Sequence, residues 1–257
     1  MHASPSPALV RTTIRSSDVT SQPALQRLLG TARLATYLTA AKGDLNRAAD
    51  LYLWVTQVSG ALHGQISFVE IAVRNAIDAQ LAIWNTARGF GADWTAAQGT
   101  ADPLYTLLRK QLEDARGRAD VEARERGSNH RRHGVAATHD DVVAQLMFGS
   151  WVKVIRPVSR TESPARQQRL WAAGVSLAFP HASSDDMSRI AIGDQLDTLR
   201  RLRNRVAHHD NLLEVALKHR LNGMLSLLAK LDPAYPQLAA ARSTLRQLIK
   251  DDPRRAW

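Results

Sequence analysis

The sequence contains no cysteine among its 257 residues. This absence excludes disulfide bonds, zinc sites built on thiolates and cysteine nucleophiles, and nothing argues for an oxidising compartment. No apolar run approaches the roughly 20 residues that a helix needs to cross a bilayer. Residues 1–13 contain Ser and Pro but lack the apolar segment of a secretory signal. We therefore expect a cytoplasmic protein with no membrane partner.

Aromatic residues are also scarce, at 5% of the chain, whereas hydrophobic residues as a whole make up 44%. Ala and Leu dominate the apolar set, and both enter helices at little cost, while strands favour aromatic and β-branched residues. No alternating strand pattern of useful length is present. We therefore predict an all-α fold, with a poorly ordered Ser- and Pro-rich segment at residues 1–22 and a single helical domain at residues 23–257.

Apolar residues at helical spacing set the expected helices. These begin near Pro23 and cover residues 45–61, 67–84, 104–123, 188–206, 212–231 and 235–249, and a further apolar segment follows Thr138. Asp140 and Asp141 follow Thr138 where a helix dipole favours carboxylates, so Thr138 is expected to cap that segment. We expect a Gly-rich loop at residues 85–103. The most polar stretch, residues 116–134, is interpreted as an exposed loop or a frayed helix end.

The chain carries 34 Lys and Arg against 24 Asp and Glu, a formal net charge of +10. Such an excess attracts polyanions over long range and supports contacts with phosphates. Because Arg far outnumbers Lys, a high-GC coding bias explains the excess equally well. Charge alone therefore leaves the partner open.

One short segment near the end of an expected helix combines groups that suit phosphate chemistry. Asn204 and His208 are four residues apart and share a helix face, so the Asn204 side chain is expected to orient the imidazole. Arg203 lies five residues before His208, and its long side chain is expected to reach the same space. Arg205 lies three residues before His208 and four before His209, which places a second cation near by.

These side-chain types fit attack by a ribose 2′-hydroxyl on the adjacent phosphodiester. Histidine ordinarily titrates near about pH 6.5, so an imidazole can take a proton from an oxygen or return one at neutral pH. A guanidinium offers planar, permanently charged donors that match phosphate oxygens and stabilise the charge on phosphorus without a metal. The 2′-hydroxyl is the nucleophile, so the reaction would be confined to RNA.

The order Arg203-Asn204-x-x-x-His208 resembles the signature of HEPN ribonucleases. The fuller string over residues 202–210 resembles more narrowly that of the Abi-like (abortive infection) family of bacterial HEPN proteins. Residues 68–76, 138–152 and 170–180 resemble three other stretches of that family in the same order, so the likeness extends from about residue 25 to 230. The family often has Pro two residues after its double His, where this chain has Asn211, but Asp210 keeps the expected carboxylate.

The resemblance implies an HEPN-type helical bundle with additional helices and loops. It implies metal-independent RNA cleavage without a cofactor, which leaves 2′,3′-cyclic phosphate ends, with Arg203, Asn204 and His208 as the catalytic residues. It further implies a homodimer whose two Arg–His motifs line one cleft. Members are linked to phage defence or to toxin–antitoxin pairs, which implies an antitoxin or other regulatory partner.

A second group of candidate residues lies on the expected helix at 67–84. Glu70 and Arg74, four residues apart, are suited to an ordinary helix ion pair. The alternative is a supporting role in which they orient Arg203 or His208. Asn75 belongs to the same group, because an amide on a largely apolar helix needs partners if it is buried.

Blander interpretations of these motifs stay open. Cations and His at a helix C-terminus complement the dipole and the last carbonyls, which explains Arg203 and His208 without catalysis. The chain would then be a silent RNA-binding protein of the same fold or a helical interaction protein. His130 and His133 are flanked by Arg131 and Arg132, which favours a solvated basic loop over a metal site. Five tryptophans have the ring type that stacks on bases: Trp54, Trp84, Trp94, Trp151 and Trp171. The apolar spacing around Trp54, Trp151 and Trp171 favours core packing instead.

Overall fold

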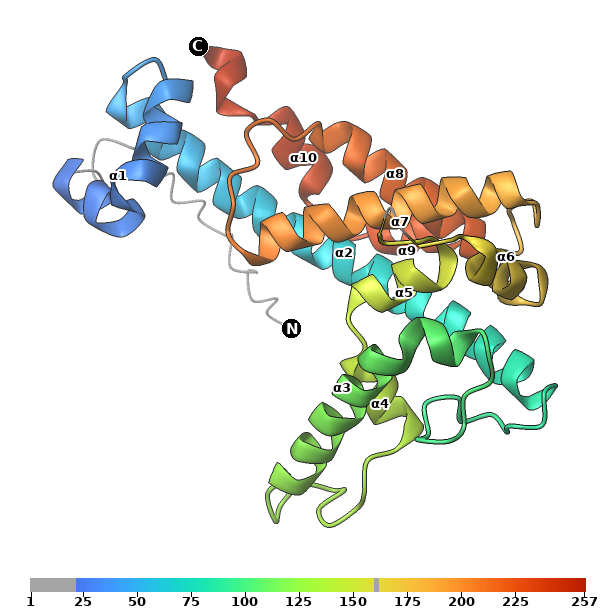
Figure 1. The fold of residues 1–257 in the computed structure, drawn as a ribbon. Helices are drawn as coiled ribbons and strands as arrows, with labels where there is room; N and C mark the ends of the chain where they lie inside the picture. Colours follow the sequence, from blue (N-terminus) through green and yellow to red (C-terminus); the bar gives the residue numbers. More distant parts are fainter. Residues whose placement is uncertain (1–21, 160–161) are drawn as a thin grey trace, which may run out of the picture. The chain divides into compact units, whose positions relative to one another are not determined.

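A computed structural model describes residues 22–159 and 162–257, and all regular secondary structure in these ranges is helical (Figure 1). The predicted all-α fold class is thereby confirmed, while the HEPN-type topology stays a prediction. The expected poorly ordered segment, residues 1–22, lies outside the described residues except for Gln22. Within the described ranges no helix combines the length and the apolar character needed to cross a bilayer.

The chain divides into two compact units. One contains the residues up to Gly60 together with Leu245–Trp257, and the other contains Ala61–Thr244. The single domain expected over residues 23–257 stays a prediction, and each unit is described by itself.

The first unit is built from α1 (Gln22–Ala40), the first part of α2 (Leu45–Thr86), α10 (Leu245–Lys250) and the 3₁₀ helix η3 (Pro253–Ala256). Gly30 interrupts α1 with a φ of 71°, a conformation that costs glycine little. The indole N–H of Trp54 on α2 donates to the carbonyl of Leu248 on α10 at 2.7 Å. This bond fixes the C-terminal helix within the unit.

The second unit holds the remaining helices around a core of Leu, Val, Ile and Trp side chains. In chain order these are the rest of α2, α3 (Leu104–Glu125), α4 (His139–Gln145), α5 (Phe148–Ile155), α6 (Ala165–Ala172), η2 (Val175–Ala178), α7 (Asp186–Ala207), α8 (Leu217–Leu231) and α9 (Tyr235–Ala240).

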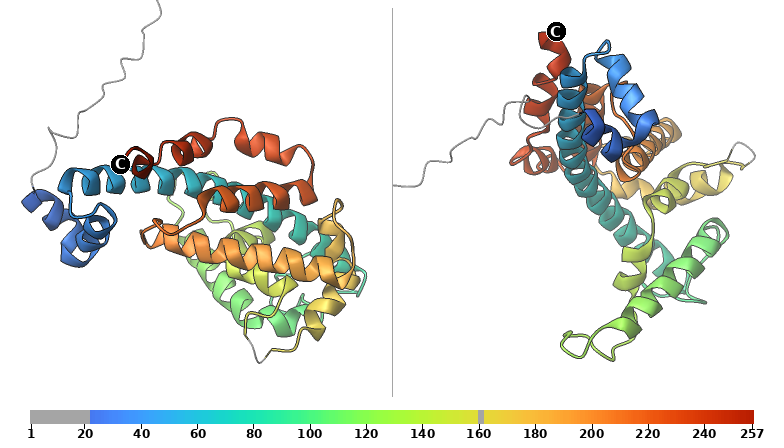
Figure 2. Two further views of the ribbon diagram at one scale, coloured as in Figure 1. Left: turned by 90° about the horizontal axis from the view of Figure 1, so that it is seen from above. Right: turned by 90° about the vertical axis from the view of Figure 1, so that its left-hand side faces the viewer.

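The short apolar helix α5 lies at the centre of this unit. Most of its residues are buried, and it packs against α3, α6 and α7. On another side α7 contacts α8, and the two helices run side by side in Figure 2. Helix α7 is thereby held between α5 and α8.

Helix α2 is longer than the sequence pattern predicts. The separate helices expected at 45–61 and 67–84 form one helix, because Leu62, Gln65 and Ile66 continue the buried face through the predicted break. Gly60 and Gly64 do not stop the helix, since a helix tolerates an isolated glycine at about 1 kcal/mol each.

The helix predicted over residues 104–123 is confirmed as α3, whereas the overlapping prediction of a loop or frayed end over residues 116–134 is wrong up to Glu125. Helix α3 continues to Glu125 because Ala115, Ala119 and Ala123, spaced by four, are buried along one face. The other side of the helix carries the charges that suggested exposure. Residues 126–138 do form a loop, and Thr138 and Asp141 form the predicted cap of α4, with the Thr138 N–H donating to the Asp141 carboxylate at 2.8 Å.

Two predictions near the C-terminus need correction. The helix expected at 212–231 begins only at Leu217, because Leu212 and Leu213 are buried within the preceding loop. The helix expected at 235–249 is divided into α9 and α10, since a turn closes at Ser243, whose N–H donates to the carbonyl of Ala240 at 3.2 Å. Helix α6 and η2 were not predicted.

Candidate functional site

Helix α7 carries the Arg203–His208 segment and ends in a defined cap. His208 is the C-cap residue, and its backbone N–H donates to the carbonyl of Asn204 at 2.9 Å. The N–H of His209 donates to Val206 at 3.1 Å, and that of Asp210 donates to Arg205 at 2.9 Å. This pair of bonds is the Schellman motif, which satisfies the last helix carbonyls.

His209 takes the left-handed position of this motif, with a φ of 52°. Glycine ordinarily occupies that position because a Cβ atom is strained there, although His is among the residues that tolerate it best. The chain therefore places the imidazole of His209 at a position where glycine would be less strained.

Arg205 connects the last turn of α7 with the residues that follow the double His. Its Nε donates to the Asp210 carboxylate at 3.0 Å, and its Nη2 donates to the carbonyl of Asn211 at 2.6 Å. Asp210 also accepts the N–H of Asn211 at 2.8 Å. The backbone on both sides of His208 and His209 is thus held by one guanidinium.

The His208 side chain is exposed and forms no hydrogen bond with any residue that the structure describes. The hydrogen bond expected between the Asn204 side chain and the imidazole is not formed. The two residues are joined only by the backbone bond from His208 N–H to the Asn204 carbonyl. Asn204 lies half-buried on α7. The imidazole is therefore accessible but is not oriented by Asn204 in this subunit.

Arg203 lies on a different side of α7 from His208. Positions five residues apart differ by about 140° around a helix. Arg203 is half-buried and lies near Glu70 on α2. Burial raises the pKa of the Glu70 carboxyl, and the positive charges of Arg203, Arg74 and His63 offset only part of that rise. The structure thus brings Arg203, Glu70 and Arg74 within electrostatic range, and among the described residues it shows no hydrogen bond between Arg203 and His208.

Asn75 differs from its expectation. The side chain is exposed rather than buried, and its only hydrogen bond within the described chain comes from the Nε of Arg74 at 3.4 Å. The argument that a buried amide needs partners therefore does not apply to Asn75.

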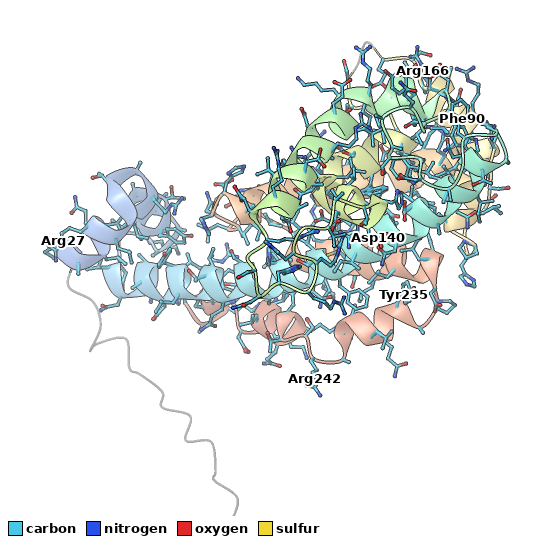
Figure 3. All side chains as sticks on the ribbon, turned by 90° about the horizontal axis from the view of Figure 1, so that it is seen from below. Arg27, Phe90, Asp140, Arg166, Tyr235 and Arg242 are labelled. Atoms are coloured by element: carbon cyan, nitrogen blue, oxygen red, sulfur yellow. The ribbon has the colours of Figure 1, made fainter. Side chains whose placement is uncertain are left out.

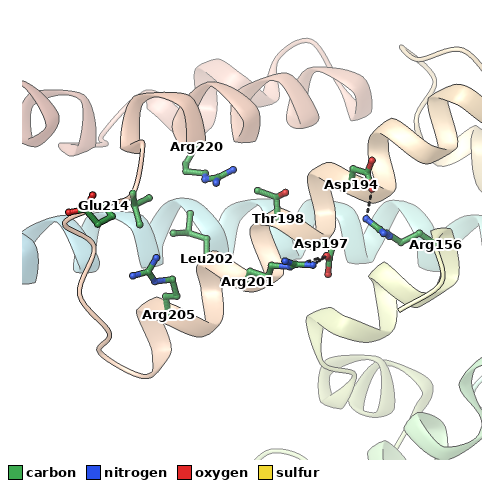
Figure 4. Close-up of a pocket in the computed structure, with 10 residues that line it drawn as sticks. Arg156, Asp194, Asp197, Thr198, Arg201, Leu202, Arg205, Glu214 and Arg220 are labelled. Atoms are coloured by element: carbon green, nitrogen blue, oxygen red, sulfur yellow. Dashed lines mark hydrogen bonds and ion pairs between the residues drawn. The ribbon is translucent and has the colours of Figure 1, made fainter. Parts of the chain in front are cut away.

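A pocket opens along the side of α7 that Arg205 faces, and its volume is about 470 Å³ (Figure 4). It lies between α7, the loop that follows it, the start of α8 and the end of α5. The lining residues are Arg156, Asp194, Asp197, Thr198, Arg201, Leu202, Arg205, Glu214, Val215 and Arg220. Of these only Arg205 was a candidate from the sequence. The signal that could have revealed the pocket is the spacing of Asp194, Thr198, Arg201 and Arg205 along one helix face.

The other His candidates lie away from α7. His130 and His133 are exposed in the loop after α3, as expected of a solvated basic segment. His139 instead contacts two carboxylates, with Nε2 at 3.0 Å from Asp78 and Nδ1 at 2.9 Å from Asp93, and these contacts raise its pKa. Across the described ranges no cluster of three or more His, Asp or Glu side chains suits a metal ion.

Neither the tryptophans nor the surface charge indicates a nucleic-acid site away from α7. Trp54, Trp84, Trp94, Trp151 and Trp171 are all buried, which confirms the core packing predicted for Trp54, Trp151 and Trp171. Positive side chains are spread over the surface; Figure 3 shows Arg242 and Arg166, for example, projecting from different elements. Comparisons with family models, curated proteins and solved structures give no match. The likeness to the Abi-like HEPN family therefore rests on the sequence motifs.

Proposed function

We propose that this chain is a metal-independent endoribonuclease of the Abi-like HEPN type. The observation that carries the proposal is the state of His208, whose imidazole is exposed and has no hydrogen-bond partner within residues 22–159 and 162–257, at a capped helix end. An imidazole that served only to cap the helix would be expected to bond the last carbonyls, and backbone N–H groups already occupy several of these. Arg203 and Arg205 in the preceding turn supply charge for a phosphate.

In the proposed reaction the neutral His208 imidazole takes the proton of a ribose 2′-hydroxyl. The 2′-oxygen forms a bond to the adjacent phosphorus, and the bond from phosphorus to the 5′-oxygen breaks. The 5′-oxygen then receives the proton, which leaves a 2′,3′-cyclic phosphate on one product and a 5′-hydroxyl on the other. Arg203 stabilises the additional negative charge on the phosphate oxygens as the new bond forms.

The separation of Arg203 and His208 around α7 favours a site completed by a second copy. In a homodimer with the two α7 ends facing one cleft, the arginine of one copy would approach the histidine of the other. Asn204 would then orient the partner's imidazole or bind RNA. Glu70 and Arg74 on α2 would orient the Arg203 guanidinium toward the cleft. A role in phage defence or as the toxin of a toxin–antitoxin pair, restrained by an antitoxin, belongs to the same proposal.

The test is incubation of the purified chain with labelled single-stranded RNA in EDTA, followed by analysis of the product ends. We expect cyclic phosphate and 5′-hydroxyl ends from the unchanged protein. His208→Ala should lose this activity by at least about a hundredfold, since general acid–base catalysis contributes about that much or more. His181→Ala is the matched control, because His181 is another exposed imidazole of the same unit. Equal activity in the two variants would reject His208 as the catalytic base.

The second candidate function is RNA binding without cleavage. It is favoured by the lack of a hydrogen bond between Arg203 and His208 among the described residues and by their positions on different sides of α7. Binding that weakens as salt rises, with no cyclic phosphate ends at any protein concentration, would decide for it.

A further inference from the structure

The pocket beside α7 contains four arginines against three carboxylates. Most of these charges are already paired. Arg156 pairs with Asp194, and Arg201 pairs with Asp197 at 2.9 Å (Figure 4). Arg205 is engaged by Asp210 and by the carbonyl of Asn211.

Arg220 is the exception among the arginines. It enters the pocket from α8, is half-buried, and its guanidinium has neither a hydrogen bond nor an ion pair with any residue in the described ranges. In Figure 4 its side chain extends from α8 toward Thr198 on α7. The Thr198 hydroxyl likewise has no hydrogen bond within the described chain. Two groups able to donate hydrogen bonds thus border one cavity with no protein acceptor.

A half-buried guanidinium without a counter-charge loses solvation and gains nothing in return from the protein. The two unpaired groups suit a phosphate, since the planar donors of Arg220 match phosphate oxygens and the Thr198 hydroxyl adds one further donor. The other three arginines of the pocket are neutralised by their carboxylate partners, so Arg220 supplies the unpaired positive charge within the described chain. Glu214 is the one lining carboxylate with no ion pair among the described residues, and it is exposed at the rim.

We propose that this pocket binds a phosphate group through Arg220 and Thr198. Thr198 lies ten residues before His208, about 15 Å along α7, so a strand that presents one phosphate at the α7 end can place a more distant phosphate of the same strand in the pocket. The assignment of this second phosphate to RNA rests on the proposed function. The pocket then fixes the strand, while the end of α7 performs the cleavage.

The experiment measures RNA binding in the His208→Ala background, where the strand remains intact. A short labelled single-stranded RNA is titrated at several salt concentrations, and Arg220→Gln is compared with Arg109→Gln. Arg109 is an exposed arginine of α3 with no side-chain partner in the described chain, so the two variants lose the same charge. Arg220→Gln should weaken binding about tenfold and lower the slope of log K against log salt by about 0.7, the loss of one phosphate contact to a single strand. Arg109→Gln should change neither by as much.

Two further measurements test whether the phosphate bound in the pocket belongs to RNA or to a free phosphate compound. Glu214→Gln should strengthen RNA binding, because it removes the unpaired carboxylate at the rim. Pyrophosphate should compete with RNA in the parent protein and compete less well in Arg220→Gln.

Equal weakening of RNA binding by Arg220→Gln and Arg109→Gln, together with pyrophosphate binding that does not depend on Arg220, would overturn the pocket. Pyrophosphate binding that depends on Arg220 while RNA binding does not would overturn the assignment of the phosphate to RNA. RNA cleavage by the otherwise unchanged chain is scored separately. Its absence would reject the nuclease, yet a selective loss of binding in Arg220→Gln would still support a phosphate site in an RNA-binding protein.

Discussion

The Nε of Arg205 donates a 3.0 Å hydrogen bond to the carboxylate of Asp210, across the two histidines that end α7. The bond closes a small loop in which His208 caps the helix and His209 takes a left-handed conformation. Because Arg205 also holds the carbonyl of Asn211, one side chain determines the path of the backbone around the proposed catalytic group.

Asp210→Asn should therefore impair cleavage without unfolding the chain. The pair is partly exposed, so its loss should lower the free energy of unfolding by less than about 1 kcal/mol. Misplacement of His208 should lower the rate of RNA cleavage by roughly tenfold while RNA binding stays nearly constant. Single-turnover cleavage and a binding titration check both parts. Unchanged cleavage with a folded protein would show that the Arg205–Asp210 pair does not position His208.

A second relationship gives a prediction for pH dependence. The hydrogen bond to Asp78 raises the pKa of His139 most, with a further contribution from Asp93, although burial opposes both. Folding thus favours the protonated imidazole. Its contribution to stability is complete below the unfolded pKa of about 6.5 and is lost as the pH rises through the higher folded pKa.

The measurement is chemical unfolding of the unchanged chain and of His139→Gln at about pH 6 and about pH 9. The unchanged chain should lose stability between these values. His139→Gln should be less stable by about 1–2 kcal/mol at the lower pH, because it gives up charge-assisted bonds, and should differ much less at the higher pH. A difference between the two proteins that is the same at both values would contradict the assignment.

The loop between α2 and α3 depends on one buried amide. Asn85 is fully buried; its Nδ2 donates to the carbonyls of Gly91 at 2.8 Å and Gly99 at 2.6 Å, and its Oδ1 accepts the N–H of Ala101 at 2.9 Å. Asn85→Ala would leave three backbone groups without their partner.

We expect Asn85→Ala to lower the free energy of unfolding by about 2–4 kcal/mol, measured by urea denaturation. Asn75→Ala is the control, because Asn75 is exposed and has one long hydrogen bond. Its stability should stay within about 0.5 kcal/mol of the unchanged chain. A similar small effect at Asn85 would mean that the loop is held by other contacts.

The features that sequence alone could predict are those encoded by neighbours in the chain. Ala- and Leu-rich periodicity predicted the helices, and the spacing of Thr138 and Asp141 predicted the cap of α4. The apolar pattern predicted α3 to residue 123, whereas the charge density of residues 116–134 wrongly suggested a loop, because the charges lie opposite the buried face of Ala115, Ala119 and Ala123.

Contacts between distant segments lay beyond the sequence argument. The proximity of Glu70 and Arg203 was one of two open interpretations, and only the packing of α2 near α7 places them in electrostatic range. Arg220 and Thr198 belong to different helices, and no local pattern joins them. The orientation of His208 by Asn204 failed as a prediction because helix spacing fixes the face of a residue but not the direction of its side-chain donors.

The claim on which the account depends is that the RNA supplies its own nucleophile. Its most direct test is an RNA in which the single ribose before a mapped cleavage position carries hydrogen in place of the 2′-hydroxyl, incubated with the purified chain in EDTA. We predict that cleavage at that position disappears while cleavage at other positions of the same strand continues. Continued cleavage at the 2′-deoxy position would contradict the proposed mechanism.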